Sequence, residues 1–226
     1  MLSSEQARAF YDKFGERQDR QGYYENPALQ RMLALGSFGS ARTVYEFGCG
    51  TGRLAEMLLE SHLPAGACLI ATDISPVMVG LARRRLAPFG DRAQVLLVGP
   101  EDPLASSDGV VDRLVSTYVL DLLARDRIGR FLDDAARVVR PGGLMCLVGL
   151  TEGRRGLAWG VSRLWRLVQR ASPKTVGGCR PLVLGDMVEC AAWRVRHRDV
   201  VAPWGIASEV IVAERTSGPA ATPKGG

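Results

Sequence analysis

Segments of this chain alternate between two patterns of apolar residues. Short runs rich in β-branched and apolar residues occur at 43–47, 68–72, 93–98, 109–115 and 144–150, and such runs predict buried strands. Between them, apolar side chains recur every three or four residues, as in a helix with one buried face. The clearest repeat comprises Ile128, Phe131, Leu132, Ala135, Val138 and Val139. Strands that alternate with helices predict an α/β fold.

Helices are also predicted near both ends of the chain. An apolar stripe near the N-terminus comprises Ala7, Phe10, Tyr11 and Phe14. Asn26-Pro27 predicts the start of a second, short helix that ends at Gly36. Its inward residues are Leu29, Met32 and Leu33. A helix over 186–192 precedes two more strands, over 194–201 and 208–214. The last residues, 216–226, are rich in Gly, Pro, Ala and Thr, which predicts a disordered tail.

Three glycines at alternate positions separate the first strand from the first core helix. Gly48, Gly50 and Gly52 follow the strand-like run 43–47. Glycines at such a corner allow a tight turn and let a ligand approach the main chain. A dinucleotide fingerprint would require a glycine at position 53, which is Arg53. The pattern is instead an acidic residue, Glu46, followed by three spaced glycines. An ordinary strand-to-helix turn is the alternative.

This pattern resembles motif I of the class I S-adenosylmethionine (SAM) dependent methyltransferases. The run Arg-Val-Val-Arg-Pro-Gly-Gly-Leu at 137–144 resembles a second motif of the same family. Together the resemblance covers residues 43–150. It implies a Rossmann-like, doubly wound α/β sheet of seven strands, mostly parallel with an antiparallel C-terminal strand. It also implies a helical cap over the cleft at 1–42, a SAM-binding domain at 43–215 and a substrate-region insertion at 151–185.

The resemblance assigns cofactor roles to residues of this chain. The glycine turn is expected to pass beneath the amino-acid end of SAM, with Glu46 orienting the ammonium group or the loop. Asp73 lies 21 residues after Gly52, at the end of the next strand, where a carboxylate can accept both ribose hydroxyls. Ile74 and Met78 are expected to pack against adenine, although plain core packing is the alternative for Met78. Pro100 occupies the usual position of the acidic residue that reads the adenine amino group, which leaves either Glu101 or Asp102 for that role.

Residues 116–121 follow the fourth predicted strand beside the glycine corner and are expected to face the transferable methyl group. Ser116 is assigned to the cofactor. Tyr118 and Asp121 are candidates for orienting or deprotonating the acceptor, and a helix cap or a surface carboxylate is the alternative for Asp121. Methyl transfer needs no dedicated base, because SAM supplies the reactivity. The candidate substrate residues are Tyr11, Phe14, Arg180 and Trp204.

Composition and charge indicate the number of domains, the cellular location and the kinds of ligand to expect. The 226 residues, 46% hydrophobic and 23% charged, fit one globular domain. No signal peptide and no membrane-spanning run is recognised, so a cytoplasmic protein is expected. Five cysteines without a C-x-x-C pair, and two histidines, give no reason to expect a metal site. The net charge of +5 is concentrated at 153–198, which has nine arginines and one lysine against two carboxylates. Within it, 154–170 has the pattern of an interfacial helix at the inner membrane face, with an ordinary solvated helix as the alternative.

The sequence gives less information about the methyl acceptor than about the cofactor. No Asn-Pro-Pro-Tyr or Asp-Pro-Pro-Tyr follows the fourth strand, so methylation of nucleobases or glutamine is not expected. The chain most resembles the methyltransferases of quinone biosynthesis and the soluble phosphatidylethanolamine N-methyltransferases, which implies a small, lipophilic acceptor. The alternatives are an RNA-directed methyltransferase that uses the basic 153–198 segment and a non-catalytic SAM-fold partner subunit. Nucleic acid is not the expected partner, and the sequence does not predict an oligomeric state.

Overall fold

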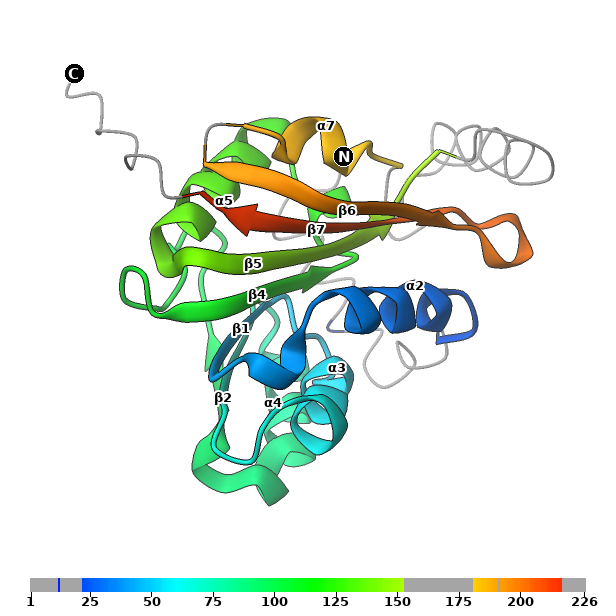
Figure 1. Cartoon of the computed structure of the whole chain (residues 1–226). Helices are drawn as coiled ribbons and strands as arrows, with labels where there is room; N and C mark the ends of the chain where they lie inside the picture. Colours follow the sequence, from blue (N-terminus) through cyan, green and yellow to red (C-terminus); the bar gives the residue numbers. More distant parts are fainter. Residues whose placement is uncertain (1–11, 13–21, 153–180, 191, 217–226) are drawn as a thin grey trace.

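One seven-stranded sheet organises the molecule (Figure 1). The computed structural model describes residues 12, 22–152, 181–190 and 192–216. The strand order is β3-β2-β1-β4-β5-β7-β6. The strands are β1 Thr43–Phe47, β2 Cys68–Asp73, β3 Ala93–Leu97, β4 Val111–Thr117, β5 Val139–Leu150, β6 Trp193–Val201 and β7 Ser208–Arg215. β1 to β5 pair in parallel, and β7 runs antiparallel to both β5 and β6. The predicted fold class is confirmed.

Helices cover both faces of the sheet. One face packs against α2 (Gly22–Leu35), α3 (Arg53–Met57) with its π-helical extension Leu58–His62, and α4 (Pro76–Leu86). The other face packs against α5 (Arg125–Val138) and α7 (Leu184–Val188). Short 3-10 turns lie at Phe38–Ser40, Ala87–Arg92, Leu120–Leu122 and Pro203–Gly205. Within the described residues, no helix is long and apolar enough to cross a membrane.

The strands send alternate side chains into two separate cores. In β1, Val44 belongs to the core beneath α2 to α4, whereas Tyr45 belongs to the core beneath α5 and α7. β5 repeats this pattern with Cys146 and Met145. This is the period of two that a pleated strand imposes, and helices on both faces explain why these strands read as continuous apolar runs. The buried stripe predicted for α5 is confirmed from Ile128 to Val138.

Several predicted boundaries were wrong. α2 begins at Gly22 rather than after Asn26-Pro27, because a helix interior loses only one hydrogen bond at Pro27 while the turns that follow are anchored by buried Ala28, Leu29 and Met32. β4 continues to Thr117, so Ser116 lies inside the strand and not after it. Pairing with Leu147 and Val148 of β5 extends β4 beyond the apolar run that marked it in the sequence.

Two later elements also differ from expectation. Pro141-Gly142-Gly143 lies within β5, where the register to β4 shifts, instead of forming a turn before it. Gly142, at φ 75°, supplies the left-handed backbone that such a bulge needs. α7 spans 184–188 rather than 186–192. The buried Glu209 carboxylate accepts from the backbone N–H groups of Leu184 (2.6 Å) and Gly185 (3.4 Å), which fixes the start of the helix two residues earlier.

Several predictions fall outside the described residues. These are the N-terminal helix with Tyr11 and Phe14, the interfacial helix at 154–170, Arg180, and nearly all of the tail at 216–226. The division into a cap, a SAM-binding domain and an insertion therefore stays a prediction. Among the described residues, no group of three His, Cys, Asp or Glu side chains is placed to hold a metal ion.

Candidate functional site

The glycine turn after β1 is tightly folded against the end of β2. The N–H groups of Gly48 and Cys49 both donate to the carbonyl of Thr72, each at 2.9 Å. Gly48, Gly50 and Gly52 all have positive φ values, at 76°, 53° and 80°. A Cβ on Gly48 would lie 2.3 Å from Val119 Cγ2, in the turn after β4. Glycine at position 48 is therefore required both by the backbone angle and by the close approach of a neighbouring loop.

Asp73 joins this turn to the start of α4. Its Oδ2 accepts from Gly50 N–H (2.9 Å) and its Oδ1 from Ser75 N–H (2.8 Å). Ser75 caps α4 by accepting from Met78 N–H, and its hydroxyl donates to Asp12 (2.5 Å). Burial raises the pKa of Asp73, and the backbone hydrogen bonds oppose that rise. Backbone groups of Gly50, Ser75 and Ile74 hydrogen-bond to this carboxylate, and a carboxylate is the kind of acceptor that suits a hydroxyl-bearing ligand.

Glu46 is buried within β1 and is 2% exposed. Burial, together with the negative charge of Asp73, raises the pKa of Glu46 to about 8. Its Oε2 atom has no hydrogen-bond partner among the residues that the structure describes. A buried carboxyl group without a hydrogen-bond partner is favourable only when it is protonated or when a ligand supplies a hydrogen-bond donor or a positive charge.

A cavity of about 650 Å³ opens beside this corner. It lies where the carboxyl ends of β1, β2 and β4 meet, at the place where ligands bind in doubly wound sheets. Eight of the predicted site residues line it: Gly48, Gly50, Asp73, Ile74, Met78, Glu101, Asp102 and Tyr118. Glu46, Gly52, Ser116, Asp121 and Trp204 are not among its lining residues.

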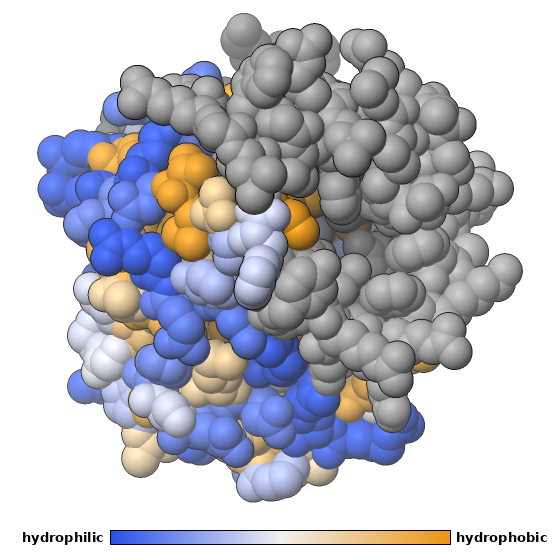
Figure 2. Space-filling view, turned by 90° about the vertical axis from the view of Figure 1, so that its right-hand side faces the viewer, coloured by the Kyte–Doolittle hydropathy of each residue, from blue (hydrophilic) through white to orange (hydrophobic). Residues whose placement is uncertain are grey.

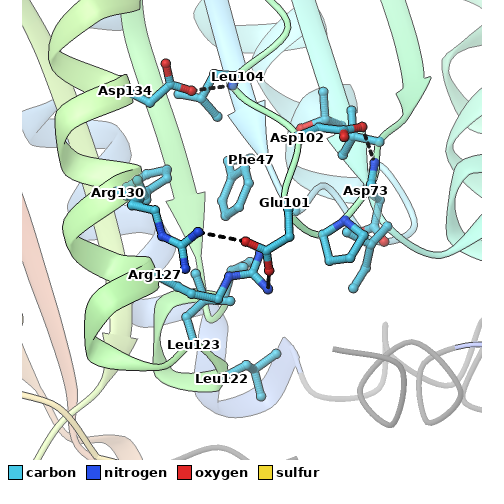
Figure 3. Close-up of a pocket in the computed structure, with 18 of the residues that line it drawn as sticks. Phe47, Asp73, Glu101, Asp102, Leu104, Leu122, Leu123, Arg127, Arg130 and Asp134 are labelled. Atoms are coloured by element: carbon cyan, nitrogen blue, oxygen red, sulfur yellow. Dashed lines mark hydrogen bonds and ion pairs between the residues drawn. The ribbon is translucent and has the colours of Figure 1, made fainter. Parts of the chain in front are cut away.

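The loop after β3 turns its two carboxylates in different directions (Figure 3). Asp102 accepts from Gly99 N–H of its own loop at 2.5 Å. Glu101 instead reaches α5, where it pairs with Arg127 and Arg130, each at 2.9 Å. The two candidates that the sequence left open are therefore distinguished by their surroundings.

The hydroxyl groups of Ser116 and Tyr118 lie within hydrogen-bond distance of other protein groups. The Ser116 hydroxyl donates to the carbonyl of Phe47 (3.1 Å), which turns it away from the cavity. Tyr118 lines the cavity with φ 57°, and its hydroxyl is 3.0 Å from Ser208 Oγ. Burial raises the pKa of Tyr118 well above its usual value, which disfavours the phenolate. Asp121 is 1% exposed in the 3-10 turn after β4, so a surface carboxylate was the wrong alternative.

Trp204 lies outside this cavity, so its predicted contact with the substrate stays a prediction. It sits in the β6–β7 connection, has φ 55°, and is 77% exposed. The end of the molecule that carries this hairpin shows small apolar areas among hydrophilic ones (Figure 2). Singly exposed apolar side chains are common on protein surfaces and indicate no particular ligand.

Other lining residues had no signal in the sequence. Phe47 and Phe131 bring their rings to 4.9 Å at the inner wall of the cavity. Leu104 lines it from the β3 loop, and Arg127 and Arg130 from α5. Phe131 was predicted as part of a buried stripe, and the two arginines fall on the polar side of that stripe. Phe131 and the two arginines line the same cavity because α5 packs beside the loop that follows β3.

The sequence of this chain is similar to those of known methyltransferases. A sequence model of the family described as "Methyltransferase domain" matches residues 44–143. Over these residues the chain is similar to that family. The malonyl-[acyl-carrier protein] O-methyltransferase of Pectobacterium atrosepticum is 31% identical over 143 residues, which are 63% of this chain and 49% of that protein. The chain thus spans about half the length of this relative.

Solved structures share the fold of this chain at low sequence identity. A chain of the complex between the Haloferax volcanii Trm112 methyltransferase activator and a methyltransferase superposes with a TM-score of 0.68 at 17% identity, covering 91% of this chain and 97% of that one. Geranyl diphosphate methyltransferase in complex with SAM superposes with a TM-score of 0.61 at 14% identity, covering 85% and 86%. The resemblance to quinone and phosphatidylethanolamine methyltransferases stays a prediction.

Proposed function

We propose that this chain transfers the methyl group of SAM to a small acceptor. The observation that carries the proposal is Asp73, which lines the cavity and whose carboxylate is positioned by backbone donors of the glycine turn and of the start of α4. The residues fit SAM in kind. Asp73 would hold the ribose hydroxyls and the glycine turn the amino-acid end, while Ile74 and Met78 would contact adenine. When bound, SAM supplies a methyl group activated by a sulfonium centre.

Glu46 and Asp102 would complete the cofactor site. A buried carboxylate with an unpartnered oxygen is suited to a cationic ligand, because a nearby positive charge favours its ionised form. Glu46 would therefore respond to the positive charges of SAM through the glycine turn. Asp102 is the better candidate for reading the adenine amino group, since Glu101 is held by two arginines.

The chain would act on its acceptor mainly by orientation. Holding a nucleophile and a methyl group near contact distance can supply on the order of 7–11 kcal/mol. Tyr118 lines the cavity with its hydroxyl at Ser208, so it would orient an acceptor as a neutral group rather than remove a proton. The apolar lining that includes Phe47, Leu122 and Leu123 supports a lipophilic acceptor.

A carboxyl acceptor is the second candidate. The malonyl-[acyl-carrier protein] O-methyltransferase relative supports it, since that protein by its name methylates a malonyl group on a carrier. The two candidates separate in an assay with radiolabelled SAM and matched acceptors: lipid amines and quinone precursors on one side, malonyl and other acyl thioesters on the other. Contact of 154–170 with the membrane is a separate proposal, tested by sedimentation with anionic liposomes after Arg163, Arg166 and Arg170 are replaced by Gln.

Calorimetric titration with SAM and S-adenosylhomocysteine tests the cofactor proposal, with NAD as the control. We expect micromolar binding of both sulfur ligands and no response to NAD. Asp73→Ala should weaken binding of both by about tenfold or more, because it removes a buried acceptor, while circular dichroism stays unchanged. If neither ligand binds the wild type, the proposal is wrong and a non-catalytic SAM-fold subunit becomes the better interpretation.

A further inference from the structure

The loop over residues 98–104 and the helix α5 form two walls of the same cavity. The base of this loop is fixed firmly to the helix. Leu104 N–H donates to the Asp134 carboxylate, and Arg137 donates to the Leu104 carbonyl at 3.0 Å. Arg137 also donates to the carbonyl of Ser106 at 3.0 Å. Figure 3 shows Asp134 beside Leu104 at this anchored end.

The tip of the loop is held in a different way. Glu101 Oε1 lies 2.9 Å from Arg127 Nη1, and Glu101 Oε2 lies 2.9 Å from Arg130 Nη1. Asp102 bonds within its own loop, to Gly99. Within the part of the chain that the structure describes, every hydrogen bond and ion pair from residues 99–103 to another element runs through Glu101. The tip is therefore joined to α5 by ion pairs between side chains, whereas the base is joined by hydrogen bonds between backbone groups of the loop and the side chains of Asp134 and Arg137.

These ion pairs cross the apolar part of the cavity. In Figure 3, Phe47 lies on one side of the Glu101 carboxylate, and Leu122 and Leu123 lie on the other. The charges also balance locally, because Arg130 pairs with Asp126 at 3.1 Å as well as with Glu101. Within this cluster, the two carboxylates and the two guanidinium groups are equal in number and opposite in charge. The arrangement is suited to closing the two walls on each other.

We infer that Glu101, Arg127 and Arg130 form a clasp that controls how fast the cofactor enters and leaves the cavity. This inference rests on the proposed function. The clasp holds the loop tip to α5 with and without ligand, so Glu101 acts as a positioning residue and does not contribute to affinity by contact. Arg127 is the stronger partner, since its side chain is 19% exposed and that of Arg130 is 64% exposed.

Stopped-flow measurement of S-adenosylhomocysteine binding to the full chain tests the clasp. In Glu101→Gln, the association and dissociation rate constants should both rise, by roughly three- to tenfold for two lost ion pairs of this exposure, while Kd changes less than about twofold. Arg127→Gln should act more strongly than Arg130→Gln. Added NaCl should speed both steps in the wild type and leave Glu101→Gln unaffected. A charge swap, Glu101→Arg with Arg127→Glu, should restore slow exchange.

The matched control is Asp108→Asn. Asp108 is another exposed carboxylate that pairs with an α5 arginine, Arg137, at 2.8 Å, but it does not line the cavity. Its loss should leave both rate constants unchanged. The clasp is overturned if Glu101→Gln binds with unaltered rates, or if only dissociation accelerates and Kd weakens, which would make Glu101 a direct ligand contact. Failure of the wild type to bind S-adenosylhomocysteine would instead overturn the proposed function and the clasp with it.

Discussion

Glu46→Gln is expected to make the folded protein more stable at alkaline pH. Glu46 is 2% exposed, and burial with the nearby charge of Asp73 raises its pKa from 4.5 to about 8. The folded chain therefore keeps this carboxyl group mostly protonated at neutral pH. The unfolded chain ionises it several pH units lower. Glutamine has a similar shape and cannot ionise, so the substitution removes this difference.

The sign follows from proton counting. Between pH 4.5 and about 8, the folded state binds one more proton at Glu46 than the unfolded state does. Stability therefore falls as pH rises through this window, by at most about 1.4 kcal/mol per unit, and the loss is complete above pH 8. The whole window sets an upper limit of about 5 kcal/mol. Relaxation around a buried charge reduces that limit, so we expect roughly 2–5 kcal/mol.

Urea unfolding from pH 5 to pH 9 measures this effect. The quantity to follow is the free energy of unfolding of Glu46→Gln minus that of the wild type. It should grow by roughly 2–5 kcal/mol across the range, because contributions from other titrating groups cancel in the difference. Glu60→Gln, at an exposed position in the π-helical turn after α3, is the control and should give a flat line. A pH-independent difference for Glu46→Gln would refute the reasoning.

Three further predictions concern the residues around this site. Gly48→Ala should lower the free energy of unfolding by about 2–4 kcal/mol, because position 48 has a positive φ and the added Cβ would overlap Val119. Adding Val119→Ala should restore only the part of this loss that comes from the overlap. Urea unfolding of the wild type, the two single variants and the double variant measures both parts. Asp112→Ala should cost about 2–3 kcal/mol without altering cofactor affinity. Burial alone would raise the pKa of Asp112, but bonds from Arg140 and two backbone N–H groups lower it, so thermal melts should show its contribution fading as pH falls below about 4. Tyr118→Phe should retain kcat within about tenfold across pH 7–9, since the phenol stays neutral, and a larger loss would restore Tyr118 as a base.

The corner between β1 and α3 was predictable because its signals are local. The glycine turn and Asp73 lie within one strand–turn–helix unit and the strand after it, so their spacing is visible in the sequence. Strand and helix periods likewise gave the order of elements in the core. These features depend on neighbours in sequence, so residue types and spacing are sufficient to find them.

The remainder depended on contacts between distant segments. The Glu209 carboxylate starts α7 from a position 24 or 25 residues away, and Ser208 reaches Tyr118 across 90 residues. The Glu101 clasp joins a loop to a helix face whose arginines read as ordinary surface residues. Ser116 illustrates the reverse case, since strand pairing places a predicted site residue inside β4, where it is buried. No local pattern distinguishes these cases.

Burial of carboxylates at this corner connects stability with binding. Both Glu46 and Asp73 have pKa values raised mainly by desolvation, so the empty folded protein is less stable at neutral and alkaline pH than it would be with neutral side chains there. A ligand that brings positive charge and hydroxyl donors would relieve both unfavourable terms on binding. Glu46→Gln should therefore be more stable than the wild type at high pH, and it should bind SAM more weakly. Opposite effects of one substitution on stability and on affinity are expected where a side chain is unfavourable for folding but favourable for ligand binding.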